Sequence, residues 1–383
     1  MDIKKLTDTI EELKDEYLKV WVDVCNIESP TTYKEGVDAV GNYLAALSQK
    51  KGWLVERFPQ PVAGDVLCIT MNPDAEKEPI CFSGHMDTVH ERGLFGYPPV
   101  RIEGDRIYGP GTEDCKGGIV AGFLAMDALA RCGFTDRPVR MLLQSDEEGG
   151  SSISGKATIN YICEKARGAA AFFNLEGGEP NDACLVRKGI VTYLLTVKGV
   201  AAHASNCAKK GANAIAEMAH KIIELEKLKD DAGLTCNCGV ISGGSVPNTV
   251  PDVCRMKINI RFATQEQLEW VREYVQRVAD TVYVPGCTCT VEQATFRVAM
   301  EYTERNQKLL DRVNEILGEH GFPLKEMVKR KGGSDAADVT VSGTPCIDSF
   351  GVDGDFIHNP GEFGYIHTLS ESAKKLAVIT YCF

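Results

Sequence analysis

The sequence of 383 residues lacks the features that would place it with membrane proteins or nucleic-acid-binding proteins. No apolar run approaches the roughly 18 residues that suggest a membrane-spanning helix, and the first 20 positions predict a charged amphipathic helix instead of a secretory signal. Basic residues are outnumbered, with 42 Lys and Arg against 54 Asp and Glu, which gives a net charge of −12. This balance disfavours nucleic acids and anionic membranes as partners. We therefore expect a cytoplasmic protein with neither kind of partner.

Clustered cysteine motifs are also lacking. The 15 cysteines are odd in number and scattered, mostly inside apolar stretches such as residues 66–69 and 345–347. This distribution predicts reduced cysteines in the core, not a disulfide framework.

Length and hydrophobic pattern predict two domains, without repeats or low-complexity linkers. Residues 1–187 alternate apolar strands with helices, which is typical of an α/β fold with a ligand site beyond the carboxyl ends of its strands. Residues 188–300 have their own amphipathic pattern of two helices and four strands. We interpret them as an inserted α+β domain, after which residues 301–383 resume the first domain.

Histidine and acidic residues follow several apolar segments of the first domain. The run at residues 80–82 ends in Ser83 and Gly84, so we expect His85 at the end of a buried strand. Asp87, two residues later, can orient a metal-bound imidazole. Asp114 precedes a predicted helix after a glycine-rich loop, where a capping role is the alternative.

Two further strands end in acids. The strand at residues 138–144 precedes Asp146, Glu147 and Glu148, and the strand at residues 169–175 precedes Glu176. Three adjacent acids often form a solvated turn. Alternatively, one is a metal ligand and its neighbour a general base, the pairing that metal-assisted hydrolysis needs. Because four successive junctions end in a histidine or an acid, we expect one shared site.

Five motifs together resemble the dinuclear zinc metallopeptidases, the family of carboxypeptidase G, acetylornithine and succinyl-diaminopimelate deacylases, aminoacylase and tripeptidase. The motifs are GHMDTV at residues 84–89, the loop 109–118, DEEGG at 146–150, the strand end at Glu176, and His358 with Glu362. They occur in the family's order and span most of the chain. The resemblance implies a zinc-peptidase catalytic domain with a mixed, mostly parallel sheet flanked by helices.

The same resemblance implies two Zn²⁺ ions per subunit, which Co²⁺ or Mn²⁺ can replace. It assigns His85, Asp114 and Glu176 to one ion and Asp114, Glu148 and His358 to the other, so that Asp114 bridges the two. Glu147 matches the family's general base, and Asp87 matches the carboxylate behind the first histidine.

For the inserted block, the resemblance implies a lid and dimerisation domain, and hence a homodimer. His203 and Asn248 match residues that reach the neighbouring subunit's active site in dimeric members. Arg261 matches the arginine that holds a substrate's α-carboxylate, and Gly333 the glycine beside that carboxylate. Arg297 resembles a further basic contact of glutamate-specific members, although Asp182 stands where a lysine is expected.

We therefore expect hydrolysis of an amide or peptide bond in a small peptide or N-acyl amino acid with a free α-carboxylate. A carboxypeptidase G-like enzyme that releases C-terminal glutamate is slightly favoured. The alternative is an N-acyl-amino-acid deacylase, and the remote alternative is a non-catalytic member that binds metal or peptide.

Overall fold

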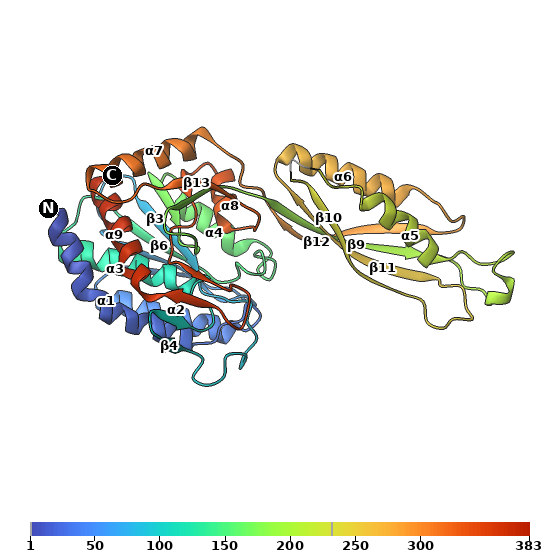
Figure 1. Ribbon diagram of the computed structural model, residues 1–383, viewed down its shortest axis with the longest axis horizontal. Coiled ribbons are helices and arrows are strands. Elements are labelled where there is room, and N and C mark those ends of the chain that lie inside the picture. Colours follow the sequence, from blue (N-terminus) through green and yellow to red (C-terminus); the bar gives the residue numbers. More distant parts are fainter. Residues whose placement is uncertain (1, 231–232) are drawn as a thin grey trace. The chain divides into compact units, whose positions relative to one another are not determined.

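The computed structural model describes residues 2–230 and 233–383, and it divides the chain into two compact units (Figure 1). The first unit comprises Met1–Val186, Tyr302–Lys329 and Ser334–Phe383, and the second comprises Arg187–Glu301 with Arg330–Gly333. The expected inserted domain, 188–300, includes residues 231–232, which lie outside the described residues. The second unit also takes in the segment 330–333, which the expected boundaries left with the catalytic domain.

The first unit is organised around a six-stranded sheet in the order β1-β2-β6-β3-β7-β14. Its parallel part consists of β3, β6, β7 and β14. At one side β2 pairs antiparallel with both β6 and β1. The bounds are β1 Leu54–Phe58, β2 Val66–Met71, β3 Ile80–His85, β6 Val139–Gln144, β7 Ala171–Asn174 and β14 Cys346–Ile347. The expectation of a mixed, mostly parallel sheet is confirmed.

Seven helices of the described residues belong to this unit and form most of its apolar core with the sheet. Helices α1, α3 and α9 pack on one another, α3 also contacts β3, and α2 contacts β1 and β2 (Figure 1). Their bounds are α1 Ile3–Asn26, α2 Lys34–Lys50, α3 Lys116–Arg131, α4 Ala157–Ala166, α7 Glu304–Glu319, α8 Asp335–Val341 and α9 Ile366–Cys382.

Two details differ from the sequence-based expectation. Helix α3 begins at Lys116 instead of residue 119, so Gly118 lies within the helix and packs closely against the backbone of Leu175. A Cβ at Gly118 would lie 1.9 Å from the carbonyl oxygen of Leu175. The strand expected at residues 344–350 is only Cys346–Ile347, because the backbone turns at Ser349, whose φ is 67°.

Two smaller sheets complete the first unit. One has the order β15-β16-β5-β4, with β4 Arg101–Glu103, β5 Arg106–Tyr108, β15 Gly354–Asp355 and β16 Phe363–Tyr365. In the other, β8 Asp182–Arg187 pairs with β13 Glu326–Arg330. The pairing of β16 with β5 brings the segment around residues 362–365 beside the loop that precedes α3.

The second unit contains an antiparallel sheet in the order β10-β11-β9-β12 and two helices. The bounds are β9 Gly189–Lys198, β10 Thr235–Gly243, β11 Val253–Phe262, β12 Thr288–Arg297, α5 Ala214–Leu225 and α6 Gln265–Asp280. A short 3₁₀ helix spans Ala204–Asn206. Helices α5 and α6 pack on each other and on the sheet, forming a separate apolar core. Residues alternate between buried and more exposed along β9 and β11, so the face opposite the helices is open.

Candidate active site

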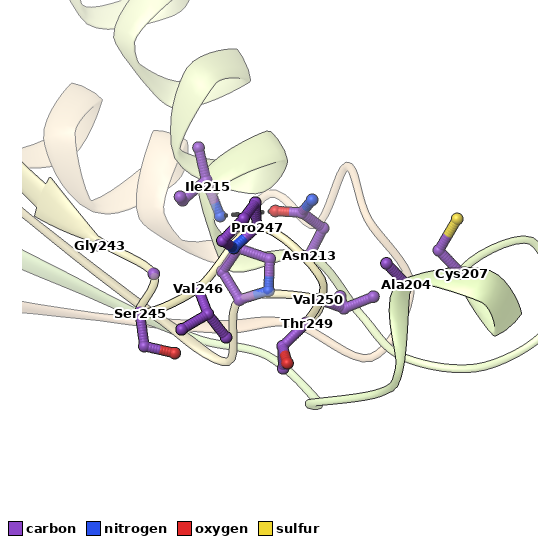
Figure 2. Close-up of a pocket in the computed structure, with 12 residues that line it drawn as sticks. Ala204, Cys207, Asn213, Ile215, Gly243, Ser245, Val246, Pro247, Thr249 and Val250 are labelled. Atoms are coloured by element: carbon purple, nitrogen blue, oxygen red, sulfur yellow. Dashed lines mark hydrogen bonds between the residues drawn. The ribbon is translucent and has the colours of Figure 1, made fainter.

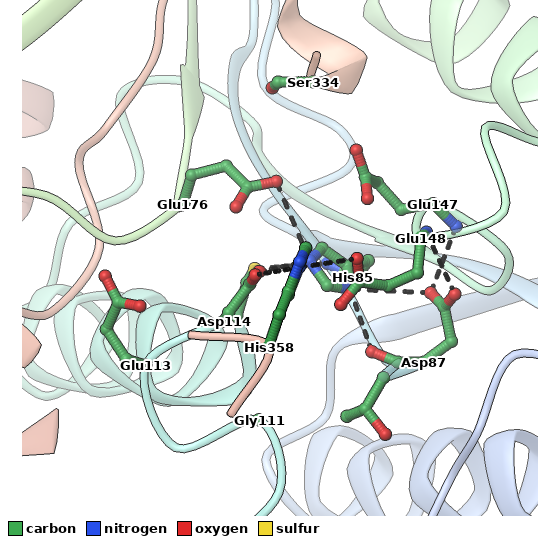
Figure 3. Close-up of polar contacts among 12 residues, drawn as sticks. His85, Asp87, Gly111, Glu113, Asp114, Glu147, Glu148, Glu176, Ser334 and His358 are labelled. Carbon is green, nitrogen blue, oxygen red and sulfur yellow. Dashed lines mark hydrogen bonds and ion pairs between the residues drawn. The ribbon is translucent and has the colours of Figure 1, made fainter. Parts of the chain in front are cut away.

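Parallel strands bring the polar strand ends of the first unit together. His85 is the last residue of β3, Glu147 and Glu148 lie in the turn after β6, and Glu176 follows β7. Because β6 and β7 flank β3 and run parallel to it, these three carboxyl ends meet at one edge of the sheet. Asp114 approaches from the loop before α3 (Figure 3).

Asp114 lies between two groups of side chains (Figure 3). Its Oδ1 is 2.9 Å from His85 Nε2, which is itself 3.7 Å from Glu176 Oε1. Its Oδ2 is 3.2 Å from His358 Nε2, which is also 3.2 Å from Glu148 Oε2. The five residues named from sequence as metal ligands are thus close together, in the two sets that the resemblance implied, with one Asp114 oxygen facing each set.

Asp87 was expected only behind His85, but it also contacts the turn that carries Glu147 and Glu148. His85 Nδ1 lies 2.9 Å from the backbone oxygen of Asp87 and 3.5 Å from its Oδ1. The Asp87 carboxylate instead accepts hydrogen bonds from the backbone N–H groups of Glu147 at 3.1 Å and Glu148 at 3.2 Å, and from the Thr31 hydroxyl at 2.7 Å. Asp87 therefore joins the His85 strand end to the acidic turn.

The neighbouring acids Glu147 and Glu148 point in different directions from this turn (Figure 3). Glu148 reaches His358, and Glu147, which is 5% exposed, does not share that ion pair. This divergence lets one side chain act as a ligand while the other faces a reacting group.

The charge balance of the site fits bound divalent cations. Burial and the Asp114 charge raise the pKa of Glu148 to about 8, and the same two causes raise the pKa of Glu176 well above its usual value. Hydrogen bonds to Asp114 and Glu148 raise the pKa of His358 to about 10. Buried carboxylates that resist ionisation are stabilised as anions when a cation binds, and metal binding then releases protons. Imidazole nitrogens with carboxylate oxygens are ligands that Zn²⁺ accepts.

Cys115 was not singled out from the sequence. Its Sγ accepts a hydrogen bond from the His85 backbone N–H at 3.3 Å, and it forms a potential metal-binding group with His85 and Glu176. Thr31 was also missed. Thr31 carries no local sequence signal, because the fold brings it to Asp87 across 56 residues. Cys115 did carry one, since it directly follows the predicted ligand Asp114.

The substrate-binding residues expected in the second unit form two groups. His203 and Asn248 are adjacent, since Ala204 N donates to the Asn248 oxygen at 2.9 Å, and both are exposed. Neither residue lines the nearby open pocket of about 510 Å³, but their chain neighbours Ala204, Pro247 and Thr249 do (Figure 2).

Arg261 and Arg297 are separated by one strand. Each pairs in register with Ile190, one from β11 and the other from β12, so all three lie on the same open face of the sheet. A Cβ at Gly333 would lie 2.6 Å from Arg297 Cδ and 3.4 Å from Ile190 Cδ1. Gly333 therefore allows a close approach of backbone to this arginine.

Similarity to known proteins agrees with this geometry. The model of the peptidase family M20/M25/M40 matches residues 81–380. Carboxypeptidase G2 of Pseudomonas sp. (strain RS-16) is 29% identical over 348 residues, covering 89% of this chain and 83% of its own.

Two solved structures share the fold. The aminopeptidase PepT of Bacillus cereus ATCC 10987 has a TM-score of 0.79 at 20% identity, covering 96% of this chain and 98% of its own. The YXEP protein of Bacillus subtilis, described as a dinuclear metal-binding peptidase, has a TM-score of 0.70 at 14% identity, covering 97% and 98%.

The chain belongs to the peptidase family M20/M25/M40 and is a metal-dependent hydrolase. Across residues 2–230 and 233–383, the helices lack the combination of length and apolar character needed to cross a membrane. All fifteen cysteines are free, and nine of them are buried, as expected for core cysteines, whereas Cys207 is exposed.

Proposed function

We propose that the protein hydrolyses an amide or peptide bond in small substrates that carry a free α-carboxylate, using two divalent metal ions. The observation that carries the proposal is the position of Asp114, with one carboxylate oxygen facing His85 and the other facing His358. A single carboxylate between two sets of nitrogen and oxygen ligands suits a pair of ions. The proposed ions are Zn²⁺, with Co²⁺ or Mn²⁺ as substitutes.

Bound metal ions would lower the proton affinity of a water molecule and polarise the amide carbonyl. Glu147 is the proposed general base, because its side chain leaves the same turn as Glu148 without entering the His358 ion pair. It takes the proton of the attacking water and passes it to the leaving amine, which completes cleavage. Asp87 holds the backbone of Glu147 and thus orients the base.

The substrate's α-carboxylate is proposed to bind Arg261, whose planar guanidinium matches a carboxylate. Arg297 lies on the same sheet face, one strand beyond Ile190. Two arginines at this spacing favour a substrate with a second acidic group, such as a C-terminal glutamate. Carboxypeptidase G2, at 29% identity, is consistent with that preference. N-acyl-amino-acid deacylation uses the same chemistry and is the alternative, whereas a non-catalytic binding role would leave Glu147 without a function.

The test is release of amino acids from dipeptides and N-acyl amino acids by zinc- or cobalt-loaded protein. We expect substrates with C-terminal glutamate to be cleaved fastest and their C-terminally amidated forms to be cleaved much more slowly. Equal rates for amides and free acids would reject the carboxylate clamp. Faster cleavage of acetyl or succinyl amino acids than of dipeptides would favour the deacylase.

We also propose a homodimer formed through the second unit. Strand β10 is an edge strand with no charged residue, and its Val240 and Ile241 are 59% and 51% exposed. Monomeric proteins usually protect such edges with charged residues or proline. Ile215 and Ile223 of α5, which packs on β10, are also exposed. A second copy of this chain is the proposed partner.

We also propose a cytoplasmic location, which the free cysteines fit.

A further inference from the structure

Glu362 is buried at 1% exposure, and its carboxylate accepts hydrogen bonds from the loop that carries Asp114. Its Oε1 accepts the backbone N–H groups of Glu113 at 2.9 Å and Asp114 at 3.1 Å. Its Oε2 accepts the N–H of Gly111 at 3.2 Å and lies 2.6 Å from His90 Nε2. The backbone of Glu362 adds a bond, because its oxygen accepts the N–H of Gly109 at 3.3 Å.

This one side chain joins three segments that are far apart in sequence. His90 follows the β3 strand end at His85, the loop 109–114 ends at Asp114, and Glu362 itself stands four residues after His358. Each of these segments therefore carries a proposed metal ligand.

Only a carboxylate suits these contacts. An ionised glutamate offers two oxygens that both accept, whereas glutamine replaces one of them with a donor. In Glu362→Gln, the N–H₂ group would face either the backbone N–H groups of Glu113 and Asp114 or the backbone N–H of Gly111. A buried donor left opposite another donor loses its bond and displaces the loop.

We propose that Glu362, supported by His90, is a positioning residue that sets the location of Asp114 between the two metal sites. The inference rests on the metal ions of the proposed function, but it concerns their binding and not the reaction. Because Asp114 faces both ligand sets, loss of the Glu362 carboxylate weakens both ions together.

The experiment is a Co²⁺ titration of metal-free protein against a competing chelator, with the visible absorption of bound Co²⁺ recorded. Changes in residues that orient metal ligands typically cost about 10–100-fold in affinity. We expect a loss of that size for both ions in Glu362→Gln, together with an altered Co²⁺ spectrum. His90→Leu should show a smaller loss. His90→Gln, which retains a donor for Oε2, should approach the wild-type affinity.

The matched control is Asp127→Asn, which alters another buried carboxylate of the first unit, one bonded to Tyr17 and Lys51 away from the loop 109–114. It should lower thermal stability without shifting Co²⁺ affinity. Wild-type affinity and spectrum in Glu362→Gln would overturn the inference, as would an equal affinity loss in Asp127→Asn.

If circular dichroism shows that Glu362→Gln does not fold, the His90 variants test the positioning role instead. Weaker binding in His90→Leu with recovery in His90→Gln supports the inference, and wild-type binding in His90→Leu overturns it. The outcome is separable from the proposed function. A wild-type protein that cleaves substrates while the variants bind Co²⁺ normally rejects only the positioning role. An inactive wild type with the expected affinity shifts rejects only the hydrolysis.

Discussion

The two units hold their candidate functional residues in different ways. In the first unit, His85, Asp87 and Glu147 are buried and connected by hydrogen bonds before any substrate arrives. In the second unit, His203 and Asn248 lie on exposed backbone, and Arg261 lies on the open face of a sheet. Metal chemistry requires fixed distances, whereas substrate recognition requires side chains that a substrate can reach. His203 and Arg261 meet the second need although each already has a hydrogen-bond partner, Ser205 and the Lys331 backbone oxygen respectively. We infer that the first unit supplies the reaction and the second supplies selectivity.

The largest expected effect comes from the first unit. Glu147→Gln removes the proposed base without removing a ligand, so turnover should fall by at least about 10²–10⁴-fold while both metals stay bound. Asp114→Ala should lose metal as well as activity. Rate measurements with elemental analysis check both variants. A metal-free Glu147→Gln would mean that Glu147 and Glu148 exchange roles.

A second prediction asks whether the second unit of one subunit serves the other subunit. The resemblance implies that His203 reaches the active site of the neighbouring subunit, and we propose that it stabilises the negative charge that develops on the carbonyl oxygen there. His203→Ala should then lower kcat by about 10²–10³-fold. Mixing inactive Glu147→Gln with His203→Ala under subunit exchange should then restore activity, because each heterodimer has one site with both residues intact. His220→Ala, which alters another histidine of the second unit, is the control and should keep full activity.

Absence of recovery despite proven exchange, or an active monomer in solution, would contradict action across subunits. The second unit would then supply its residues to the active site of its own chain.

The third prediction concerns the open face of the second unit. Arg261→Ala removes a charge-assisted contact of about 1.5–3 kcal/mol, so kcat/KM for substrates with a free carboxylate should fall about 10–100-fold. C-terminally amidated substrates should be nearly unaffected. Lys257→Ala removes a cation from the same strand and face, and it should change neither value. An equal loss for acids and amides would show that Arg261 is structural.

The difference between the units also explains what the sequence could predict. His85, Glu148 and Glu176 were predictable because each follows an apolar strand, and parallel strands bring their ends together. The hydrogen bonds of Asp87 were not predictable, since they reach backbone N–H groups 60 and 61 residues away. Local periodicity predicted the strands of Arg261 and Arg297 but not their common register with Ile190, which depends on how β9 pairs with both neighbours.

The smallest expected effect concerns two buried lysines that hold the chain just after Glu176. Lys325 Nζ donates to the Asp182 oxygen at 3.1 Å, and Lys375 Nζ donates to the Pro180 oxygen at 2.8 Å. Burial and the nearby Lys375 charge lower the pKa of Lys325 from 10.5 to about 7. Between those values the unfolded chain binds a proton that the folded chain does not, so this residue makes stability rise with pH from about 7 to 10.5.

Lys325→Met removes the buried charge and keeps an unbranched side chain, at the cost of one hydrogen bond to a carbonyl. Replacing buried charges with apolar groups is often stabilising, and a net gain of about 1 kcal/mol would raise Tm by about 1–2 °C in a protein of this size. The gain should be largest at pH 7 and below, and it should shrink as the pH approaches 10 because the wild-type lysine is then neutral in both states. Lys5→Met, at an exposed position of α1, should leave Tm unchanged at every pH. A Tm difference that does not vary with pH would show that Lys325 stays charged in the folded protein.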